Sequence, residues 1–240
     1  MLHSPPPPLL EVSGIAAGYR RMQVLWGVDL TIHAHESVVL LGANGAGKTT
    51  LLKAIMSLVE VWAGRVAFGG EDITRLRPDQ RVRRGIVFMS ETSGFPGLSI
   101  GENILIGAQF LPKQRARERI EELYAVFPAL AARRRAPAGS LSGGQRKMLG
   151  IAKALVGEPR LLVMDEPSAG LSPLYVKEVI GVLARFRQHE LAFLIAEQNV
   201  KFLALADRVY TLDNGRIGFS GTVAEMQEND ALRRAYFGLK

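Results

Sequence analysis

The sequence predicts an α/β fold, and three stretches carry that prediction. A glycine-rich loop lies between an apolar segment at 37–41 and a helical pattern that starts at Leu51. A second apolar segment, 161–164, is followed by two adjacent acids, Asp165 and Glu166. Residues 90–157, which separate the two, are mostly helical in pattern. Because strands that alternate with helices are typical of α/β folds, we expect one α/β core interrupted by a helical segment.

The glycine-rich loop fits the phosphate-binding pattern G-x-x-x-x-G-K-[ST]. Glycines let the backbone curl, so that its amides and the positive end of the next helix bind an anion. We expect Lys48 to reach the β- and γ-phosphates of a nucleotide and Thr49 to ligate Mg²⁺. The alternative, a turn that binds nothing, is disfavoured by the flanking strand and helix. The predicted phosphate-binding residues are Gly42, Ala43, Asn44, Gly45, Ala46, Gly47, Lys48, Thr49 and Thr50.

Composition excludes several classes of protein. The 240 residues include no cysteine, which removes disulfides, thiolate metal sites and cysteine nucleophiles. No apolar run approaches the roughly 20 residues that cross a bilayer, and the proline-rich residues 1–8 predict a disordered leader. We therefore expect a soluble intracellular chain. The net charge of +7 comes from scattered arginines without interleaved aromatic residues, so we expect no nucleic-acid partner.

The first half of the chain reads as strands with few helices. Strands are predicted at 9–16, 28–32, 38–41, 63–70 and 85–89 from short apolar or alternating runs. Gly18 to Arg20 is predicted as a loop, and a helix is predicted to start near Pro78. Helices follow at 102–111 and 113–134, where apolar residues recur three and four positions apart.

The second half returns to alternating strands and helices. Helices are predicted at 144–156, 173–187, 200–206, 223–227 and 231–237, and strands at 160–165 and 191–196. Two further strands, 209–212 and 216–220, are joined by Asp213, Asn214 and Gly215, a strong hairpin signal.

The acids that end the segment at 161–164 complement the phosphate-binding loop. Asp165 follows a buried strand, where it can hold Mg²⁺ through water, and Glu166 can polarise a water that attacks a γ-phosphate. A strand that ends in two solvated acids is ordinary by itself. Beside a phosphate-binding loop, the pair indicates nucleotide hydrolysis.

A second predicted anion site lies at 141–145, where Ser142, Gly143, Gly144 and Gln145 open a helix. With these motifs in this order, nearly the whole chain resembles the ATP-binding cassette (ABC) ATPases. The resemblance implies a P-loop NTPase core, 9–89 and 158–240, with an antiparallel β subdomain and an inserted helical subdomain, 90–157. In that family two cassettes meet head to tail, so the segment 142–145 would serve the ATP of a partner subunit.

Other cassette motifs follow from the same resemblance. Tyr19 matches the aromatic residue that stacks on adenine, and 167–172 matches the loop that touches the opposing subunit. The family usually has glutamine where Glu91 stands and histidine where Gln198 stands. Glu91 can still contact Mg²⁺ or water. Because Gln198 can hydrogen-bond a γ-phosphate but cannot become a cation, we expect slower or more asymmetric hydrolysis. We do not expect an inactive site, because Glu166 is intact.

The combination of Glu91, the segment 196–199 and the ending 234–238 is similar to the LivF-type ATPase subunit of branched-chain amino-acid importers. That resemblance implies transmembrane permease subunits, a LivG-type second ATPase or a head-to-tail copy of this chain, and indirectly an extracytoplasmic solute-binding protein. The chain would lie at the cytoplasmic face of the inner (plasma) membrane. Urea or amide importers, lipid or lipopolysaccharide exporters, and a soluble ABC ATPase that acts on nucleic acid remain alternatives.

Overall fold

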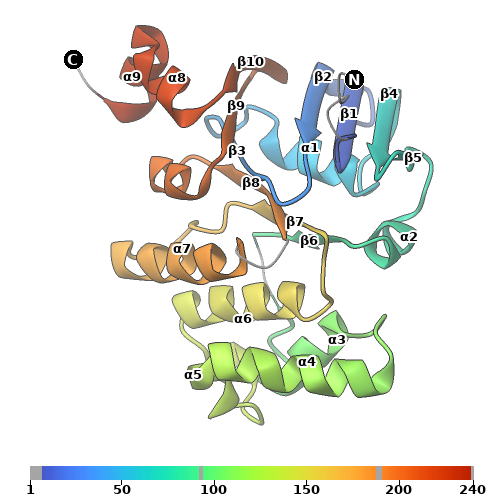
Figure 1. Cartoon of the computed structure of the whole chain (residues 1–240), viewed down its shortest axis with the longest axis vertical. Coiled ribbons are helices and arrows are strands. Elements are labelled where there is room, and N and C mark those ends of the chain that lie inside the picture. Colours follow the sequence, from blue (N-terminus) through green and yellow to red (C-terminus); the bar gives the residue numbers. More distant parts are fainter. Residues whose placement is uncertain (1–6, 92–93, 188–190, 239–240) are drawn as a thin grey trace, which may run out of the picture.

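A computed structural model describes residues 7–91, 94–187 and 191–238 (Figure 1). The predicted leader, 1–8, lies mostly outside the described residues. The strands form two sheets, with the order β10-β9-β3-β8-β7-β6 in the larger and β2-β1-β4-β5 in the smaller. This architecture confirms the α/β fold class that the sequence predicts.

The larger sheet is parallel except at one edge. Strands β9, β3, β8, β7 and β6 run parallel, and β10 pairs antiparallel with β9 through the predicted turn at Asn214 and Gly215. The strands are β3 (Ser37–Leu41), β6 (Ile86–Met89), β7 (Leu161–Asp165), β8 (Ala192–Glu197), β9 (Arg208–Asp213) and β10 (Arg216–Gly221).

The smaller sheet is antiparallel throughout. Its strands are β1 (Leu10–Tyr19), β2 (Met22–Ile32), β4 (Val61–Phe68) and β5 (Glu71–Asp72). The predicted loop at Gly18 to Arg20 is wrong in part, because β1 continues to Tyr19, which pairs with Met22 across a two-residue turn. Three shifts of register between Val12 and Gly18 let the strand run on past Gly14, so that the ladder extends further than hydrophobic alternation indicates.

The parallel sheet is buried on both faces, as such sheets usually are. Val38 and Leu40 of β3 face a core shared with α1 (Lys48–Ile55) and the antiparallel sheet. Val39 and Leu41 face a second core formed with the helices on the opposite side. Helix α1 therefore lies between the two sheets (Figure 1), and its first residue, Lys48, is joined to the end of β3 by the glycine-rich loop 42–47.

The helices from 100 to 155 lie on one side of the parallel sheet, with α6 between the sheet and α4 (Figure 1). One prediction here is wrong. The single helix at 113–134 ends at Val126 and restarts at Pro128, because proline has no amide hydrogen to donate and crowds the preceding turn. The elements are α2 (Pro78–Arg83), α3 (Ile100–Gly107), α4 (Lys113–Val126), α5 (Pro128–Ala131), η1 (Ala138–Ser140) and α6 (Gly143–Leu155).

The helical elements in the last third of the chain pack against the core on the same face of the sheet. Helix α7 has the predicted bounds, and the predicted helix at 200–206 is a 3₁₀ helix, η2. No helix among the described residues is long and apolar enough to cross a bilayer. The remaining elements are α7 (Pro173–Arg187), η2 (Val200–Leu205), α8 (Val223–Glu228) and α9 (Asp230–Phe237).

Candidate functional site

The predicted site residues gather at one edge of the parallel sheet. Strands β3, β8, β7 and β6 are neighbours in that order, and parallel strands end at the same edge. The segments that follow them therefore lie side by side, as in other α/β proteins that bind ligands at the carboxyl ends of their strands. These segments carry the glycine-rich loop, Gln198, the pair Asp165 and Glu166, and Glu91.

Glycine is required in the loop at two positions for different reasons. A Cβ atom on Gly42 would lie 2.5 Å from the carbonyl oxygen of Leu212 on β9, so the close approach of two backbones needs a bare residue. Gly47 precedes α1 with a φ of 106°, a left-handed conformation that favours glycine. The loop thus turns tightly into the first turn of α1, where unpaired amides and the helix dipole favour an anion.

Lys48 is the buried cation of the site. Its side chain is only 4% exposed, and its ammonium lies 3.1 Å from Glu166 Oε1. The same ammonium donates hydrogen bonds to the carbonyl oxygens of Gly42, at 2.9 Å, and Ala43, at 3.1 Å. Lys48 is therefore held at the centre of the loop by oxygens from both β3 and β7 segments.

Thr49 and Asp165 form the second contact between the loop and β7. The Thr49 hydroxyl donates to Asp165 Oδ1 at 3.0 Å. Burial raises the pKa of Asp165, and the nearby Glu166 raises it further, whereas the Thr49 hydrogen bond lowers it. A hydroxyl and a carboxylate are hard oxygen ligands of the kind that Mg²⁺ prefers, so this pair fits a magnesium site. Within the described ranges, no cluster of three acidic or histidine side chains is preformed for a metal.

Glu166 is held by both its backbone and its carboxylate. Its φ of 46° is unusual for a residue other than glycine, and its amide donates to the carbonyl oxygen of Ala196 at 2.9 Å. Gln198 donates to Glu166 Oε1 at 3.2 Å, and it also hydrogen-bonds the side chain of Asn44 in the loop. The structure thus brings together four of the predicted residues: Lys48, Asn44, Glu166 and Gln198.

Two predicted residues keep exposed side chains outside this cluster. Tyr19 is 43% exposed at the end of β1. Glu91 is also exposed, and its backbone carbonyl oxygen accepts a hydrogen bond from Lys147. Among the described residues, no hydrogen bond joins the Glu91 carboxylate to Thr49 or Asp165.

The predicted second anion site opens α6. Ser142 accepts a hydrogen bond from the amide of Gln145, and the Gln145 side chain accepts one from the amide of Ser142, which makes a capping box. The ring of Tyr175 covers Gly144, where a Cβ atom would lie 2.4 Å from it. Apart from its chain neighbours and the adjacent backbone of α6, no described residue has a heavy atom within 4 Å of the corresponding position on Gly143. No hydrogen bond or ion pair within the described parts of the chain joins this segment to the glycine-rich loop.

Sequence reasoning missed Glu197, which is 2% exposed. Its carboxylate accepts four hydrogen bonds: from the amide and the hydroxyl of Ser168, at 2.7 and 2.9 Å, and from the amides of Gln198 and Asn199, at 3.1 and 3.2 Å. Burial raises the pKa of Glu197, and these donors partly oppose that shift. Glu197 therefore fixes the segment after β8 to the segment after β7. Its position next to Gln198 is the only signal in the sequence.

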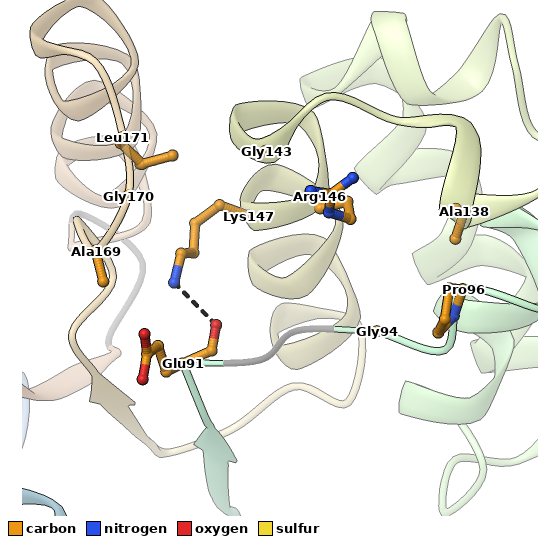
Figure 2. Close-up of a pocket in the computed structure, with 11 residues that line it drawn as sticks. Glu91, Gly94, Pro96, Ala138, Gly143, Arg146, Lys147, Ala169, Gly170 and Leu171 are labelled. Carbon is orange, nitrogen blue, oxygen red and sulfur yellow. Dashed lines mark hydrogen bonds between the residues drawn. The ribbon is translucent and has the colours of Figure 1, made fainter.

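Sequence reasoning also missed Lys147, a buried lysine on the second turn of α6. Its ammonium donates to the carbonyl oxygens of Glu91, at 3.0 Å, and Glu166, at 3.2 Å. Burial lowers the pKa of Lys147. Figure 2 shows the side chain reaching across a cavity of about 480 Å³ toward Glu91. The signal in the sequence that could have indicated a buried lysine was its place on the otherwise apolar face of the predicted helix at 144–156.

Comparison with known proteins agrees with this geometry. Residues 25–169 match the family model described as ABC transporter. The chain is 36% identical to a probable branched-chain amino acid transport ATP-binding protein, LivF, of Archaeoglobus fulgidus, over 96% of this chain and 99% of that protein. It is 34% identical to the high-affinity branched-chain amino acid transport protein BraG of Pseudomonas aeruginosa, over 96% and 100%.

An export protein and a solved structure are also similar. The lipopolysaccharide export system ATP-binding protein LptB of Haemophilus influenzae is 34% identical, over 96% of this chain and 97% of its own length. The ADP conformation of an ATP-binding cassette of an ABC transporter matches with a TM-score of 0.85 and 26% identity, over 97% of this chain and 100% of that one.

The hydrogen bonds of Glu197 generate a stability prediction. Replacing the residue, Glu197→Ala, leaves the amides of Ser168, Gln198 and Asn199 without their buried acceptor. We expect the free energy of unfolding, measured by urea denaturation, to fall by about 3 kcal/mol. The exposed-residue control Glu178→Ala is expected to change it by less than about 0.5 kcal/mol. Equal losses in the two variants would contradict the role assigned to Glu197.

Proposed function

The chain belongs to the ABC transporter family of ATP-binding proteins, and from this premise we propose that it energises a membrane importer of branched-chain or related amino acids. ABC ATPases bind ATP and hydrolyse it to drive transport, work with membrane permease components and dimerise. The observation that carries the finer proposal is the identity of 36% over nearly the full length of a LivF-type protein.

Lipopolysaccharide export is the second candidate, because an export ATPase is 34% identical to the chain. The side chain of Gln198 favours import. It occupies the place beside Glu166 where the export ATPases that resemble this chain usually carry histidine. Urea or amide importers fit the same residues as amino-acid importers. A role on nucleic acid is disfavoured, since the chain has one phosphate-binding loop and no cysteine ligands for zinc.

We assign the nucleotide to the edge of the parallel sheet. The loop residues 42–50 would surround the phosphates, with Lys48 on the β- and γ-phosphates, and Tyr19 would stack on adenine. Thr49 and Asp165 would hold Mg²⁺, with Glu91 as a further oxygen donor near it. A bound Mg²⁺ would neutralise phosphate charge that develops during transfer.

Hydrolysis would depend on Glu166 and Gln198. Glu166 would accept a hydrogen bond from the attacking water and take its proton as the bond to the γ-phosphate forms. Gln198, which contacts Glu166 and the loop residue Asn44, would donate to a γ-phosphate oxygen. Lys48 would exchange the Glu166 carboxylate for phosphate oxygens when ATP binds, which frees that carboxylate for the water.

The site is incomplete within one chain. Among the described residues, no hydrogen bond or ion pair joins the capping segment at Ser142 to Gln145 to the glycine-rich loop, and the open space beside Gly143 leaves room for a ligand to approach the backbone. We propose that this segment binds the ATP of a partner subunit, either a LivG-type ATPase or a second copy of this chain. The permease and, through it, an extracytoplasmic binding protein would hold the pair at the cytoplasmic face of the inner membrane. Residues 9–89 with 158–240 would move as the nucleotide core, and 90–157 as the helical part.

Capture of the tagged chain from membranes of its own cells tests the transport proposal. Co-purification of permease subunits and of an amino-acid-binding protein is the expected result. Recovery of lipopolysaccharide-export components would favour the second candidate. Recovery with nucleic acid and without membrane proteins would overturn both.

Glu166→Gln is expected to keep ATP binding and to lose at least about 100-fold in hydrolysis, since an amide cannot accept the proton of the attacking water. Lys48→Ala is expected to lose binding itself, because it removes the cation of the phosphate site. Calorimetry measures binding, and phosphate release measures hydrolysis. A Glu166→Gln variant with the turnover of the wild type would refute the assigned role.

Gln198→His restores a side chain that can carry a positive charge near neutral pH. We expect the steady-state rate of ATP hydrolysis to rise by roughly threefold or more, because a cation stabilises the developing phosphate charge better than an amide. The exposed Gln227→His serves as the control with an unchanged rate. Identical kinetics for the wild type and Gln198→His would place residue 198 away from the γ-phosphate.

A further inference from the structure

Lys147 has partners that a buried lysine needs, and they come from two different loops. The residue is 6% exposed. Its ammonium donates to the carbonyl oxygen of Glu91 in the segment after β6 and to that of Glu166 in the segment after β7. Figure 2 shows this side chain leaving α6 toward Glu91, beside Ala169 and Gly170 of the segment after β7. One ammonium thus joins a helix to the ends of two neighbouring strands.

The contact at Glu166 acts on a residue whose backbone is strained. Glu166 has a positive φ, and such conformations persist only when the surrounding structure holds them. Its amide is bound by Ala196 of β8, and its carbonyl oxygen is bound by Lys147 of α6. The direction of the carboxylate therefore depends on both of these contacts.

The charge of Lys147 suits this place. Burial lowers the pKa of Lys147, and the nearby carboxylates of Glu91, Glu197, Asp165 and Glu166 oppose that shift by attracting the ammonium. A charged donor also makes stronger hydrogen bonds to carbonyl oxygens than a neutral one does. If residue 147 only filled space in the core, an apolar side chain would serve better, because burying it costs less free energy than burying an ammonium. The carboxylates and the hydrogen-bonded carbonyl oxygens around Lys147 indicate that its charge is used.

We propose that Lys147 is a positioning residue for hydrolysis: its ammonium holds the backbone of Glu166 and of Glu91, so that the Glu166 carboxylate is aligned only while α6 lies against the ends of β6 and β7. This inference rests on the hydrolytic role proposed for Glu166. Because Ser142 caps the start of α6, the same helix that would meet the partner's nucleotide also holds this chain's own Glu166. Displacement of α6 would break both carbonyl contacts together.

The test compares Lys147→Met, Lys147→Arg and the control Lys153→Met. Methionine keeps the length and apolar stem of the side chain and removes every donor. Lys153 is a half-buried lysine on the same helix whose ammonium lies over the ring of Phe95, so its loss removes a similar charge without touching Glu166. Hydrolysis, ATP affinity and melting temperature are measured for each variant in the complex that is captured from membranes.

For Lys147→Met we expect kcat to fall on the order of 10- to 100-fold, since a small misplacement of a catalytic group costs that much. The dissociation constant for ATP should stay within about twofold of the wild-type value, because the contacts of Lys48 are untouched. Lys147→Arg, which keeps a charged donor, should recover most of kcat, and Lys153→Met should retain the wild-type rate.

An unchanged kcat in Lys147→Met would overturn the inference, and so would an equal loss of kcat in Lys153→Met. If Lys147→Met does not fold, Lys147→Gln replaces it with the same expectation, because the shorter amide cannot reach both carbonyl oxygens. A wild-type complex that binds ATP without hydrolysing it would instead refute the proposed function, and this inference with it.

Discussion

The contact between Lys48 and Glu166 is the constraint on which the site depends. It joins the helix after β3 to the segment after β7, and with a lysine only 4% exposed it lies where water screens charges weakly. Taking a charged group out of water is costly unless it is paired. Lys48 must therefore stay close to negatively charged oxygens, and Glu166 to positively charged or hydrogen-bond-donating groups. Phosphate oxygens would satisfy Lys48 as well as Glu166 does. Without nucleotide, Lys48 and Glu166 therefore pair with each other. Once phosphate oxygens replace Glu166 as the partner of Lys48, Lys48 would bind phosphate and the Glu166 carboxylate would be free.

The sheet determines which groups can meet at this contact. β8 lies between β3 and β7, so Glu197 at its end and Gln198 just after it stand between the phosphate-binding loop and the pair of acids. The buried carboxylate of Glu197 fixes Ser168 to the backbone of this segment, and Gln198 then reaches both Asn44 and Glu166. Lys147 on α6 donates a further hydrogen bond, to the backbone carbonyl oxygen of Glu166. Glu166 is thus held by parts of the chain that are distant in sequence: Lys48 and Gln198 contact its carboxylate, and Lys147 binds its backbone carbonyl oxygen.

Short motifs made much of this predictable. The loop at 42–50, the acids after β7 and the position of Gln198 follow from spacing within a few residues of a strand end, and the structure places them together. The roles of these residues in binding and hydrolysis remain predictions. Glu197 and Lys147 could not be found this way, because their partners lie 29 residues away for Ser168 and 56 for Glu91. The break in the helix predicted at 113–134, by contrast, could have been predicted from the sequence, because Pro128 has no amide hydrogen to donate.

The most direct test is a crystal structure of the chain with a non-hydrolysable ATP analogue and Mg²⁺. We expect the ammonium of Lys48 to lie within hydrogen-bonding distance of the β- and γ-phosphates and more than 4 Å from the Glu166 carboxylate, which then faces the γ-phosphate. We also expect Ser142 and Gly143 of a second subunit to cover that phosphate. Lys48 still paired with Glu166, or a nucleotide bound away from the loop at 42–50, would contradict these expectations.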